Sequence, residues 1–251
     1  MGLYIETRIR TDLDQLWTHT QDPAHHQRWD LRFTEIEPLP RAHGEPQRFR
    51  YATRVLPFLA VSGTGVSAGE KERPDGTRTS ALRFASPHPL SLLAEGSGYW
   101  RYVPDGDGVR FLTGYDYRTR WGRLGAFADR RLFRPLMGWA TAWSFDRLRL
   151  WLERGITPER ALRNWLLELL ARAAVIAVSA TALADDASAL RLLGPFAAST
   201  AYLCPLLLAV ALCAALCAAP LPGTPAARRC LRRPPTRACA PRLLDTLETP
   251  R

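Results

Sequence analysis

The sequence lacks cysteine throughout its first 203 residues, although it holds five cysteines farther on. The N-terminal part therefore has no disulfide framework and no thiol nucleophile. Three of the five, Cys204, Cys213 and Cys217, lie in the most apolar stretch, where cysteine behaves as a small hydrophobic residue. Cys230 and Cys239 are too far apart for a zinc-type Cys-x-x-Cys pair. The cysteines thus support neither a redox role nor a metal site.

The sequence also lacks the short motifs that carry catalysis. It has no Gly-x-Ser-x-Gly, no His-Glu-x-x-His and no phosphate-binding glycine-rich loop, since residues 62–65 hold too few glycines in the right places. His19, His25 and His26 are not spaced to put two imidazoles on one helix face, as a helical zinc site requires. We therefore predict no catalytic residue, no metal ion and no cofactor.

Lysine is nearly absent, because Lys71 stands alone among 34 basic residues and the others are arginines. Such a composition is typical of a GC-rich genome, so the net charge of +10 is weak evidence for a nucleic-acid partner. The arginines also alternate with acidic residues, and no aromatic stacking platform stands out. We expect no nucleic-acid binding.

The N-terminus has no apolar run long enough for a signal peptide. Gly2 does not begin a myristoylation motif, because Glu6 stands where that motif requires Ser or Thr. We therefore expect the first domain to be made and kept in the cytoplasm.

What is present in the first part of the chain is a series of strand and helix signals. Residues 3–10 have strand composition, a capped helix follows, and a second short helix opens at Asp22 and runs to about Trp29. Residues 32–121 contain several predicted strands separated by turn signals. The strongest turn is at residues 104–108, since Asp-Gly permits the positive φ of a tight hairpin.

Two predicted strands have one aromatic face and one charged face. The aromatic faces carry Phe49, Tyr51, Thr53 and Val55 in the first strand, and Val109, Phe111, Thr113, Tyr115, Tyr117 and Thr119 in the second. Alternation of this kind predicts an antiparallel sheet with one side covered.

A helix over about 124–152 is expected to cover that side of the sheet. It has Leu132, Leu136, Trp139 and Trp143 at helical spacing, and Gly155 is expected to close it. Pro135 predicts a kink or break near its middle.

This order of elements resembles the START/Bet v1-like superfamily, in its bacterial SRPBCC branch of polyketide cyclase and lipid-transport proteins. The stretches 26–34 (HQRWDLRFT), 95–100 (EGSGYW) and 134–146 (RPLMGWATAWSFD) carry the resemblance. It implies an α+β helix-grip fold over residues 1–155 and an apolar cavity between the sheet and the long helix. On that basis the expected ligand-cavity residues are Phe49, Tyr51, Phe111, Thr113, Tyr115, Tyr117, Trp139 and Trp143, although the same residues could simply fill a core.

Residues 156–222 are expected to form an all-α transmembrane hairpin. No charged residue occurs from Leu192 to Ala227, and residues 196–219 would extend about 36 Å as a helix against a bilayer core of roughly 30 Å. The preceding helix, at about 164–184, is less apolar, but Glu168 and Arg172 are spaced to pair on one face. The alternative is an amphipathic helix lying on the membrane or packed on the first domain.

Charge supports two membrane crossings over one. The tail from Gly223 to Arg251 has seven arginines against two acidic residues, and the loop near Asp185 and Asp186 is acidic. With two crossings, the first domain and the tail share the cytoplasmic side, as the positive-inside rule requires. We expect a multi-pass protein of a bacterial inner membrane, with a disordered basic tail over 223–251.

Together these features favour membrane-anchored binding of a hydrophobic small molecule, such as a lipid, isoprenoid or polyketide, by a non-catalytic carrier or sensor. The first alternative is an enzyme of the polyketide cyclase/aromatase type, which a buried Arg, Asp or Tyr with a perturbed pKa would favour. The second alternative is a membrane-assembly or protein-interaction module without a ligand.

Overall fold

The computed structural model describes residues 2–42, 44–56, 59–89, 91–189, 198–234, 241 and 244. The chain divides into two compact units, one formed by Met1–Pro158 with Ala226–Arg251 and the other by Glu159–Pro225. Each unit is described by itself.

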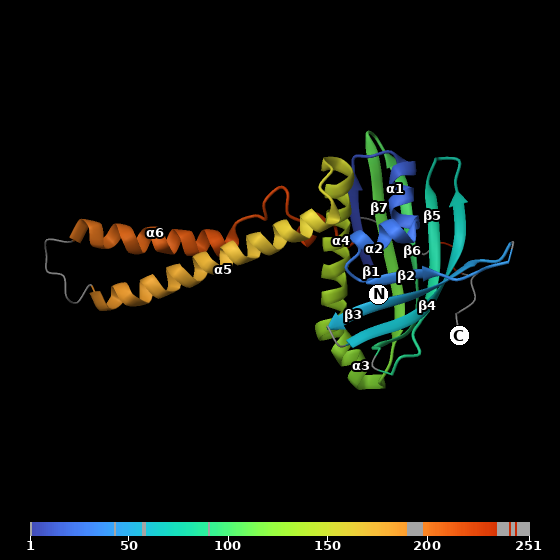
Figure 1. Ribbon diagram of the computed structural model, residues 1–251, viewed down its shortest axis with the longest axis horizontal. Coiled ribbons are helices and arrows are strands. Elements are labelled where there is room, and N and C mark those ends of the chain that lie inside the picture. Colours follow the sequence, from blue (N-terminus) through green and yellow to red (C-terminus); the bar gives the residue numbers. More distant parts are fainter. Residues whose placement is uncertain are drawn as a thin grey trace. The chain divides into compact units, whose positions relative to one another are not determined.

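The first unit is an antiparallel sheet that packs on a long helix (Figure 1). Its described strands form one seven-stranded sheet in the order β1-β7-β6-β5-β4-β3-β2. In chain order the elements are β1 (Leu3–Ile9), α1 (Leu13–Gln21), α2 (Pro23–Trp29), β2 (Glu35–Pro38), β3 (Gln47–Leu56), β4 (Leu59–Glu72), β5 (Arg78–Ala85), β6 (Leu93–Asp105), β7 (Gly108–Thr119), α3 (Gly122–Ala128), η1 (Asp129–Phe133) and α4 (Arg134–Arg154). The expected α+β helix-grip architecture is confirmed by this order and topology.

Local sequence signals account for the element boundaries. The Asp12 carboxylate accepts the Gln15 N–H at 2.7 Å and the Asp22 carboxylate accepts the Ala24 N–H at 2.8 Å, so both short helices begin at acidic caps. The predicted hairpin joins β6 to β7 with Gly106 at φ 61°.

The helix expected at 124–152 is divided into three pieces. A π-helical turn, η1, separates α3 from α4, and Pro135 lies in the first turn of α4, where the missing N–H costs nothing. Gly155 closes α4 with φ 63°, as predicted. The prediction that Leu132 and Leu136 face the sheet is wrong: they are 70% and 54% exposed, because the buried run of α4 begins only at Gly138.

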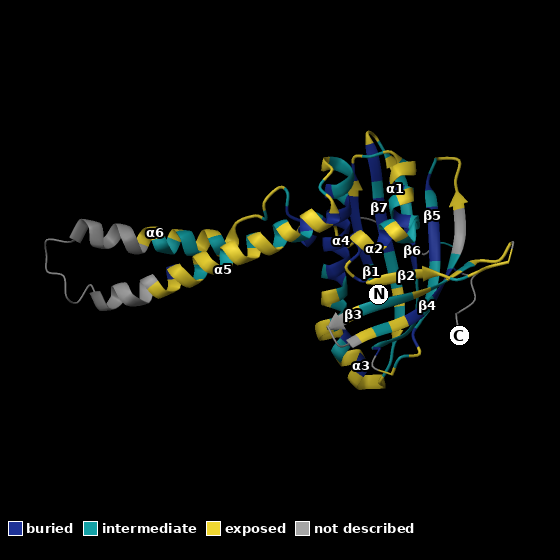
Figure 2. Cartoon of the chain, in the orientation of Figure 1, coloured by how far each residue is buried: buried dark blue, intermediate teal, exposed yellow. Residues whose placement is uncertain are grey.

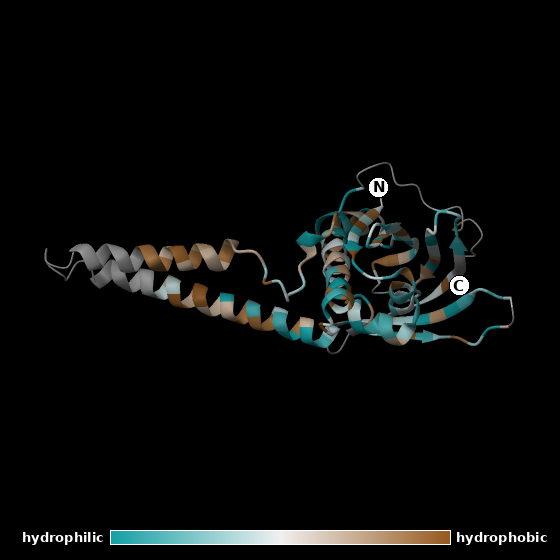
Figure 3. Ribbon diagram, turned by 90° about the horizontal axis from the view of Figure 1, so that it is seen from above, coloured by the Kyte–Doolittle hydropathy of each residue, from teal (hydrophilic) through white to brown (hydrophobic). Residues whose placement is uncertain are grey.

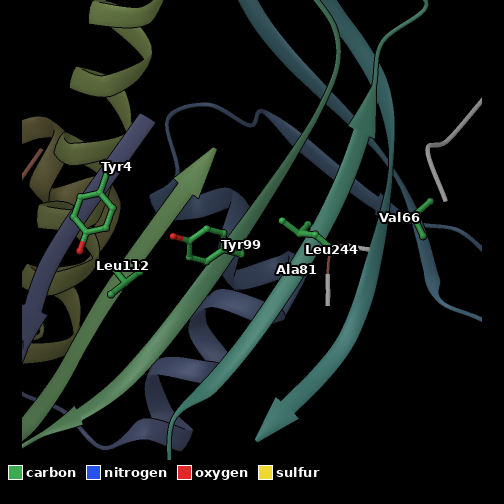
Figure 4. Close-up of a cluster of buried hydrophobic side chains, with 6 residues drawn as sticks. All are labelled: Tyr4, Val66, Ala81, Tyr99, Leu112 and Leu244. Atoms are coloured by element: carbon green, nitrogen blue, oxygen red, sulfur yellow. The ribbon is translucent and has the colours of Figure 1, made fainter. Parts of the chain in front are cut away.

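The outer face of the sheet, opposite α4, also carries a buried apolar row, whereas the sequence indicated one covered side. Leu244 from the C-terminal segment lies on this row, and its carbonyl accepts a hydrogen bond from Arg83 Nη2 at 3.0 Å. The row is formed by Tyr4, Leu112, Tyr99, Ala81 and Val66, one from each of five adjacent strands (Figure 4). The strand alternation was predicted correctly, but the covering came from a segment distant in sequence.

The sequence predicts a disordered tail over residues 223–251, but residues 226–231 are ordered. Ala226, Ala227 and Cys230 are buried, and Leu231 exchanges two backbone hydrogen bonds of 2.9 Å with Glu6 on the free edge of β1. Pairing at an exposed strand edge satisfies backbone groups that would otherwise face solvent, which orders this segment. Residues 235–240, 242–243 and 245–251 of the expected tail lie outside the described residues.

The second unit contains two helices, α5 (Pro158–Ala189) and α6 (Ala198–Cys217). The predicted pair forms, with Arg172 Nη2 at 2.7 Å from Glu168 Oε1. Arg172 also donates to the carbonyls of Ala215, Ala218 and Ala219 at 2.9–3.1 Å, and these bonds tie α5 to the C-terminal end of α6 and the residues after it. The helices are thus joined by one ionic and hydrogen-bonded centre.

The transmembrane helices expected at 164–184 and 196–219, and the multi-pass topology built on them, are not supported. Within the part of the chain that the structure describes, no helix has both the length and the apolar character that crossing a bilayer requires. α5 carries the charged Glu168–Arg172 pair and continues through the expected loop at Asp185 and Asp186. Residues 196 and 197 lie outside the described residues.

Candidate functional site

The eight predicted site residues lie on three elements of the first unit. Phe49 and Tyr51 are on β3, the four residues from Phe111 to Tyr117 are on β7, and Trp139 and Trp143 are on α4. Three strands separate β3 from β7 in the sheet. The register places the β3 and β7 residues on the inner face, the face that packs on α4, but in distant parts of it.

Aromatic rings on the inner face lie flat over glycines of neighbouring strands. A Cβ added at Gly65 would lie 2.2 Å from the Phe49 ring, and one at Gly98 would lie 2.6 Å from the Tyr115 ring. No larger residue fits beneath these rings without displacing them. The glycines of β4 and β6 therefore set the position of these two predicted site residues.

The centre of the inner face is an aromatic cluster, which we define as His26, Trp29, Trp100, Phe111 and Phe145. The Phe111 ring stacks on Phe145 with centroids 4.4 Å apart, and Trp100 lies 5.9 Å from Phe111. His26 contacts both Trp29 and Trp100, at centroid distances of 5.0 and 4.9 Å. Elements α2, β6, β7 and α4 all contribute to this cluster, and Figure 2 shows that these elements have buried parts.

Trp100 has a polar atom that the cluster does not satisfy. Its side chain is only 5% exposed, and its indole Nε1 has no hydrogen-bond partner among the described residues. A buried donor without a partner costs about 1–3 kcal/mol. An acceptor from water or from a bound molecule would remove this cost.

Beside the cluster lies a buried ion pair between Asp30 and Arg32. Arg32 donates to both carboxylate oxygens of Asp30, at 2.9 Å from Nε and 2.6 Å from Nη2, and His26 Nε2 lies 3.1 Å from the same carboxylate. Burial opposes ionisation of Asp30, but the Arg32 charge and the hydrogen bonds hold the pKa of the carboxyl well below its usual value. The pair is therefore charged in the folded protein.

Arg32 connects this pair to the predicted site residue Tyr115. Its Nη1 donates to the Tyr115 hydroxyl, and its guanidinium carbon lies 4.9 Å from the Tyr115 ring centroid. Tyr115 thus contacts a cation as well as covering Gly98.

Tyr117, the next residue along this face, has a different role. Its hydroxyl donates to Asp129 Oδ1 at 2.6 Å, and Arg134 Nη2 lies 3.1 Å from Asp129 Oδ2. Burial and the hydrogen bond to Asp129 raise the pKa of Tyr117. The contact fixes the π-helical turn to β7, so Tyr117 positions backbone rather than facing an open interior.

The remaining predicted residues form two smaller contacts. Trp139 and Trp143 stack on each other at 6.3 Å, and Tyr51 meets the Phe33 ring edge-on at 5.7 Å. Burial raises the pKa of Tyr51 to about 12. Thr113 is fully buried and its hydroxyl donates to the Tyr99 carbonyl, so its side chain packs against the neighbouring strand.

The sequence pattern did not single out six residues of the aromatic cluster and of the ion pair beside it, namely His26, Trp29, Asp30, Arg32, Trp100 and Phe145. A signal was available, because all but Phe145 lie in the stretches 26–34 and 95–100, and Phe145 lies in 134–146. These are the stretches that carry the family resemblance. Among the described residues, no cluster of three His, Cys, Asp or Glu side chains is placed to hold a metal ion.

The buried imidazole of His26 predicts an acid-sensitive stability. Burial lowers the pKa of His26 despite the opposing hydrogen bond to Asp30, so the unfolded chain binds a proton that the folded chain does not. We expect the free energy of unfolding to fall as the pH drops below about 6.5, by at most about 1.4 kcal/mol per pH unit. The pKa of Asp30 is lowered, so its contribution to the free energy of unfolding is fully present above about pH 4. Asp30 therefore does not change the stability between about pH 5 and pH 7.

Urea titrations of the full chain at about pH 7 and about pH 5 measure this dependence. His26→Gln should flatten it, whereas the control His88→Gln, at a half-exposed position, should not. An unchanged pH dependence in His26→Gln would show that another group is responsible.

No family model matches the sequence. The chain is 50% identical over 163 residues to the uncharacterized membrane protein YndG of Bacillus subtilis (strain 168), an alignment that covers 64% of this chain and 61% of that protein. The match thus spans about three-fifths of the length of this curated relative.

Several solved structures are similar at low identity. TTHA0849 from Thermus thermophilus is 19% identical with a TM-score of 0.42, covering 55% of this chain and 86% of its own. A STAR-related lipid transfer protein fragment from Xanthomonas axonopodis is 20% identical with a TM-score of 0.37, covering 45% and 67%. The Zhui aromatase/cyclase from a Streptomyces species is 16% identical with a TM-score of 0.39, covering 59% and 95%. At these scores, the fold assignment of this chain rests on its own strand order and helix packing.

Proposed function

We propose that this chain binds an apolar small molecule carrying a hydrogen-bond acceptor on the inner face of its sheet, as a membrane-associated, non-catalytic carrier or sensor. The observation that carries the proposal is the buried indole N–H of Trp100, which has no partner among the described residues.

The surroundings of Trp100 define the class of ligand. Rings of His26, Trp29 and Phe111 lie around it, and they offer apolar and π contacts. A carbonyl or ester oxygen would accept the indole N–H, and this removes the cost of burying it unpaired. Lipids, isoprenoids and polyketides share this combination of an apolar body and a carbonyl or ester group.

The second unit supports association with a membrane. Its helices expose many large apolar side chains, and the described part of α6 is strongly hydrophobic (Figure 3). Those with the greatest exposure include Leu167, Leu170, Val178, Leu206, Leu207 and Leu216, at 58–66%. An apolar surface of this kind is stabilised by lipid or by a protein partner. The name of the YndG relative favours lipid, and association would raise the concentration of membrane-dissolved ligands near the inner face.

A second candidate is an enzyme of the cyclase/aromatase type, which the buried Arg32 and Asp30 favour. Both groups have perturbed pKa values and lie next to the aromatic cluster. However, Arg32 and His26 already occupy both oxygens of Asp30, and Arg32 also binds Tyr115. Neither charged group is left free to transfer a proton, so the non-catalytic function ranks ahead of the enzyme. The Trp100 N–H without a partner among the described residues ranks it ahead of a ligand-free membrane-assembly module.

The substitution Trp100→Phe tests the proposal, because it keeps an aromatic ring and removes the N–H. We expect about a tenfold loss of affinity for the bound molecule, which corresponds to one hydrogen bond. The measurement is quantitative mass spectrometry of small molecules that co-purify with the full chain, followed by competition with the purified species.

Trp151→Phe is the matched control, since Trp151 is half-buried, contacts His19 and His25, and lies outside the aromatic cluster. A molecule retained by the wild type and by Trp151→Phe, but depleted in Trp100→Phe, supports the proposal. The same small molecules in equal amounts in all three proteins would contradict it, because lipid held only by the second unit does not depend on Trp100.

A further inference from the structure

An exposed apolar surface lies at the end of the sheet where β7 leads into α3. It consists of five large side chains, of which Leu124, Leu132 and Phe127 are 73%, 70% and 64% exposed. Leu136 and Trp121 complete it at 54% and 48%. Leu132 and Leu136 are the residues that the sequence pattern had assigned to the interior. Figure 2 shows α3 among the most exposed parts of this unit.

The exposed charges within this surface are all positive. Arg123, Arg130 and Arg131 are exposed, and the Arg131 guanidinium carbon lies 5.9 Å from the Phe127 ring centroid. The segment 120–136 has one acidic residue, Asp129, which is buried and bound by Tyr117 and Arg134. The surface therefore combines apolar side chains with uncompensated positive charge.

Local backbone geometry and one side-chain hydrogen bond fix how this segment leaves the sheet. α3 turns so tightly after β7 that a Cβ at Gly125 would lie 1.7 Å from the Arg120 carbonyl oxygen. Trp121 adopts φ 65°, a left-handed conformation that a bulky residue adopts only when its surroundings impose it. The bond from Tyr117 to Asp129 then fixes the next turn. The exposure of Leu124 and Phe127 is thus built into the fold.

We propose that this docking face, formed by Trp121, Leu124, Phe127, Leu132, Leu136 and the three exposed arginines, binds the surface of an anionic phospholipid bilayer. Leu and Phe side chains bury apolar area at the boundary between headgroups and acyl chains, where a Trp ring is also favoured. Each arginine near an anionic surface contributes about a fivefold gain in binding. The phosphates of anionic lipids favour a face whose exposed charges are all positive. A protein partner of ordinary composition would not require this.

The docking face shares no residue with the proposed ligand site or with the helices of the second unit. It would bring the first unit itself to the bilayer, from which an apolar ligand could be taken up. The loss of the docking face would therefore leave the effect of Trp100→Phe on ligand affinity unchanged.

Hydrogen–deuterium exchange of the full chain on vesicles tests the proposal segment by segment. Vesicles of equimolar phosphatidylglycerol and phosphatidylcholine should slow amide exchange in peptides covering residues 121–136 by about tenfold relative to phosphatidylcholine alone. The double substitution Arg130→Gln/Arg131→Gln should abolish most of this difference, and Leu124→Ser/Phe127→Ser should do the same. All four positions are exposed, so the fold should persist.

Arg48→Gln/Arg50→Gln is the control, because it removes the same charge from two exposed positions on β3. It should leave the protection of 121–136 intact. Equal exchange on both vesicle types would overturn the proposal, and so would equal loss of protection in the control. Protection that rises with protein concentration in vesicle-free detergent would indicate self-association and would also overturn it.

Discussion

Asp146→Ala should destabilise the first unit by about 3–5 kcal/mol, because it removes one partner from a buried ionic centre. The Asp146 side chain is 0% exposed and accepts hydrogen bonds from Arg149 at 2.7 Å, Arg229 at 2.9 Å and the Ala226 N–H at 2.8 Å. The substitution removes one acceptor from two guanidinium groups and a buried amide, and Arg149 keeps its ion pair with Glu153 at 2.8 Å. Urea unfolding of the full chain, followed by tryptophan fluorescence, measures the loss.

A second readout follows the C-terminal segment directly. Burial raises the pKa of the Cys230 thiol to about 12, and its Sγ donates to the Ala142 carbonyl. Cys230 should therefore resist alkylation in the wild type and react in Asp146→Ala, once Ala226 and Arg229 are released. Peptide mass spectrometry distinguishes it from the exposed Cys213 and Cys217.

Glu37→Ala is the matched control for loss of a carboxylate. Glu37 and Arg50 form an exposed pair at 3.6 Å with side chains 57% and 62% exposed, so the change should cost less than about 1 kcal/mol. A similar small effect in Asp146→Ala, with Cys230 still protected, would show that the C-terminal segment is held mainly by other contacts.

Asp30→Leu should have an effect of the same size, about 3–5 kcal/mol, because it leaves the Arg32 charge buried without its partner. Arg32 is 6% exposed and has Asp30 as its carboxylate partner, with Tyr115 as a further acceptor. Arg32→Met should likewise destabilise the protein, since it leaves the Asp30 carboxylate with only His26 and a backbone N–H.

The double variant Asp30→Leu/Arg32→Met tests whether the two losses of stability come from the interaction between Asp30 and Arg32. Because neither charge remains, it should lose much less stability than the sum of the two single variants. Urea midpoints of the four proteins complete the cycle. Additive losses would contradict a direct energetic coupling between Asp30 and Arg32, and would assign their effects to independent packing.

The parts of the fold that could be predicted from sequence are those set by neighbouring residues. The alternation at residues 109–119 has a period of two, so it identified a strand and its faces without knowledge of the partner strands. The helix start at Asp22 and the turn at 104–108 were likewise local, since each depends on a hydrogen bond or a φ value within a few residues.

The candidate site was less predictable because it depends on register between strands. Alternation placed Phe49 and Phe111 on inward faces, but only the strand order shows that three strands separate them. Trp100 became prominent only when α2 and β7 were brought around it and its indole N–H was left without a partner among the described residues. Similarly, Asp30 and Arg32 are near in sequence, but burial converts an ordinary local pair into a strong one.

The sequence by itself determined the α+β class, the strand faces, the short helices and the apolar character of the second unit, because these follow from local periodicity and composition. Tertiary structure alone decided that Leu132 and Leu136 face outward and that residues 226–231 pack on β1 and α4. The physical reason is that burial and hydrogen bonding between distant segments depend on which surfaces meet. A helical period specifies a face, and only the packed fold specifies what covers it.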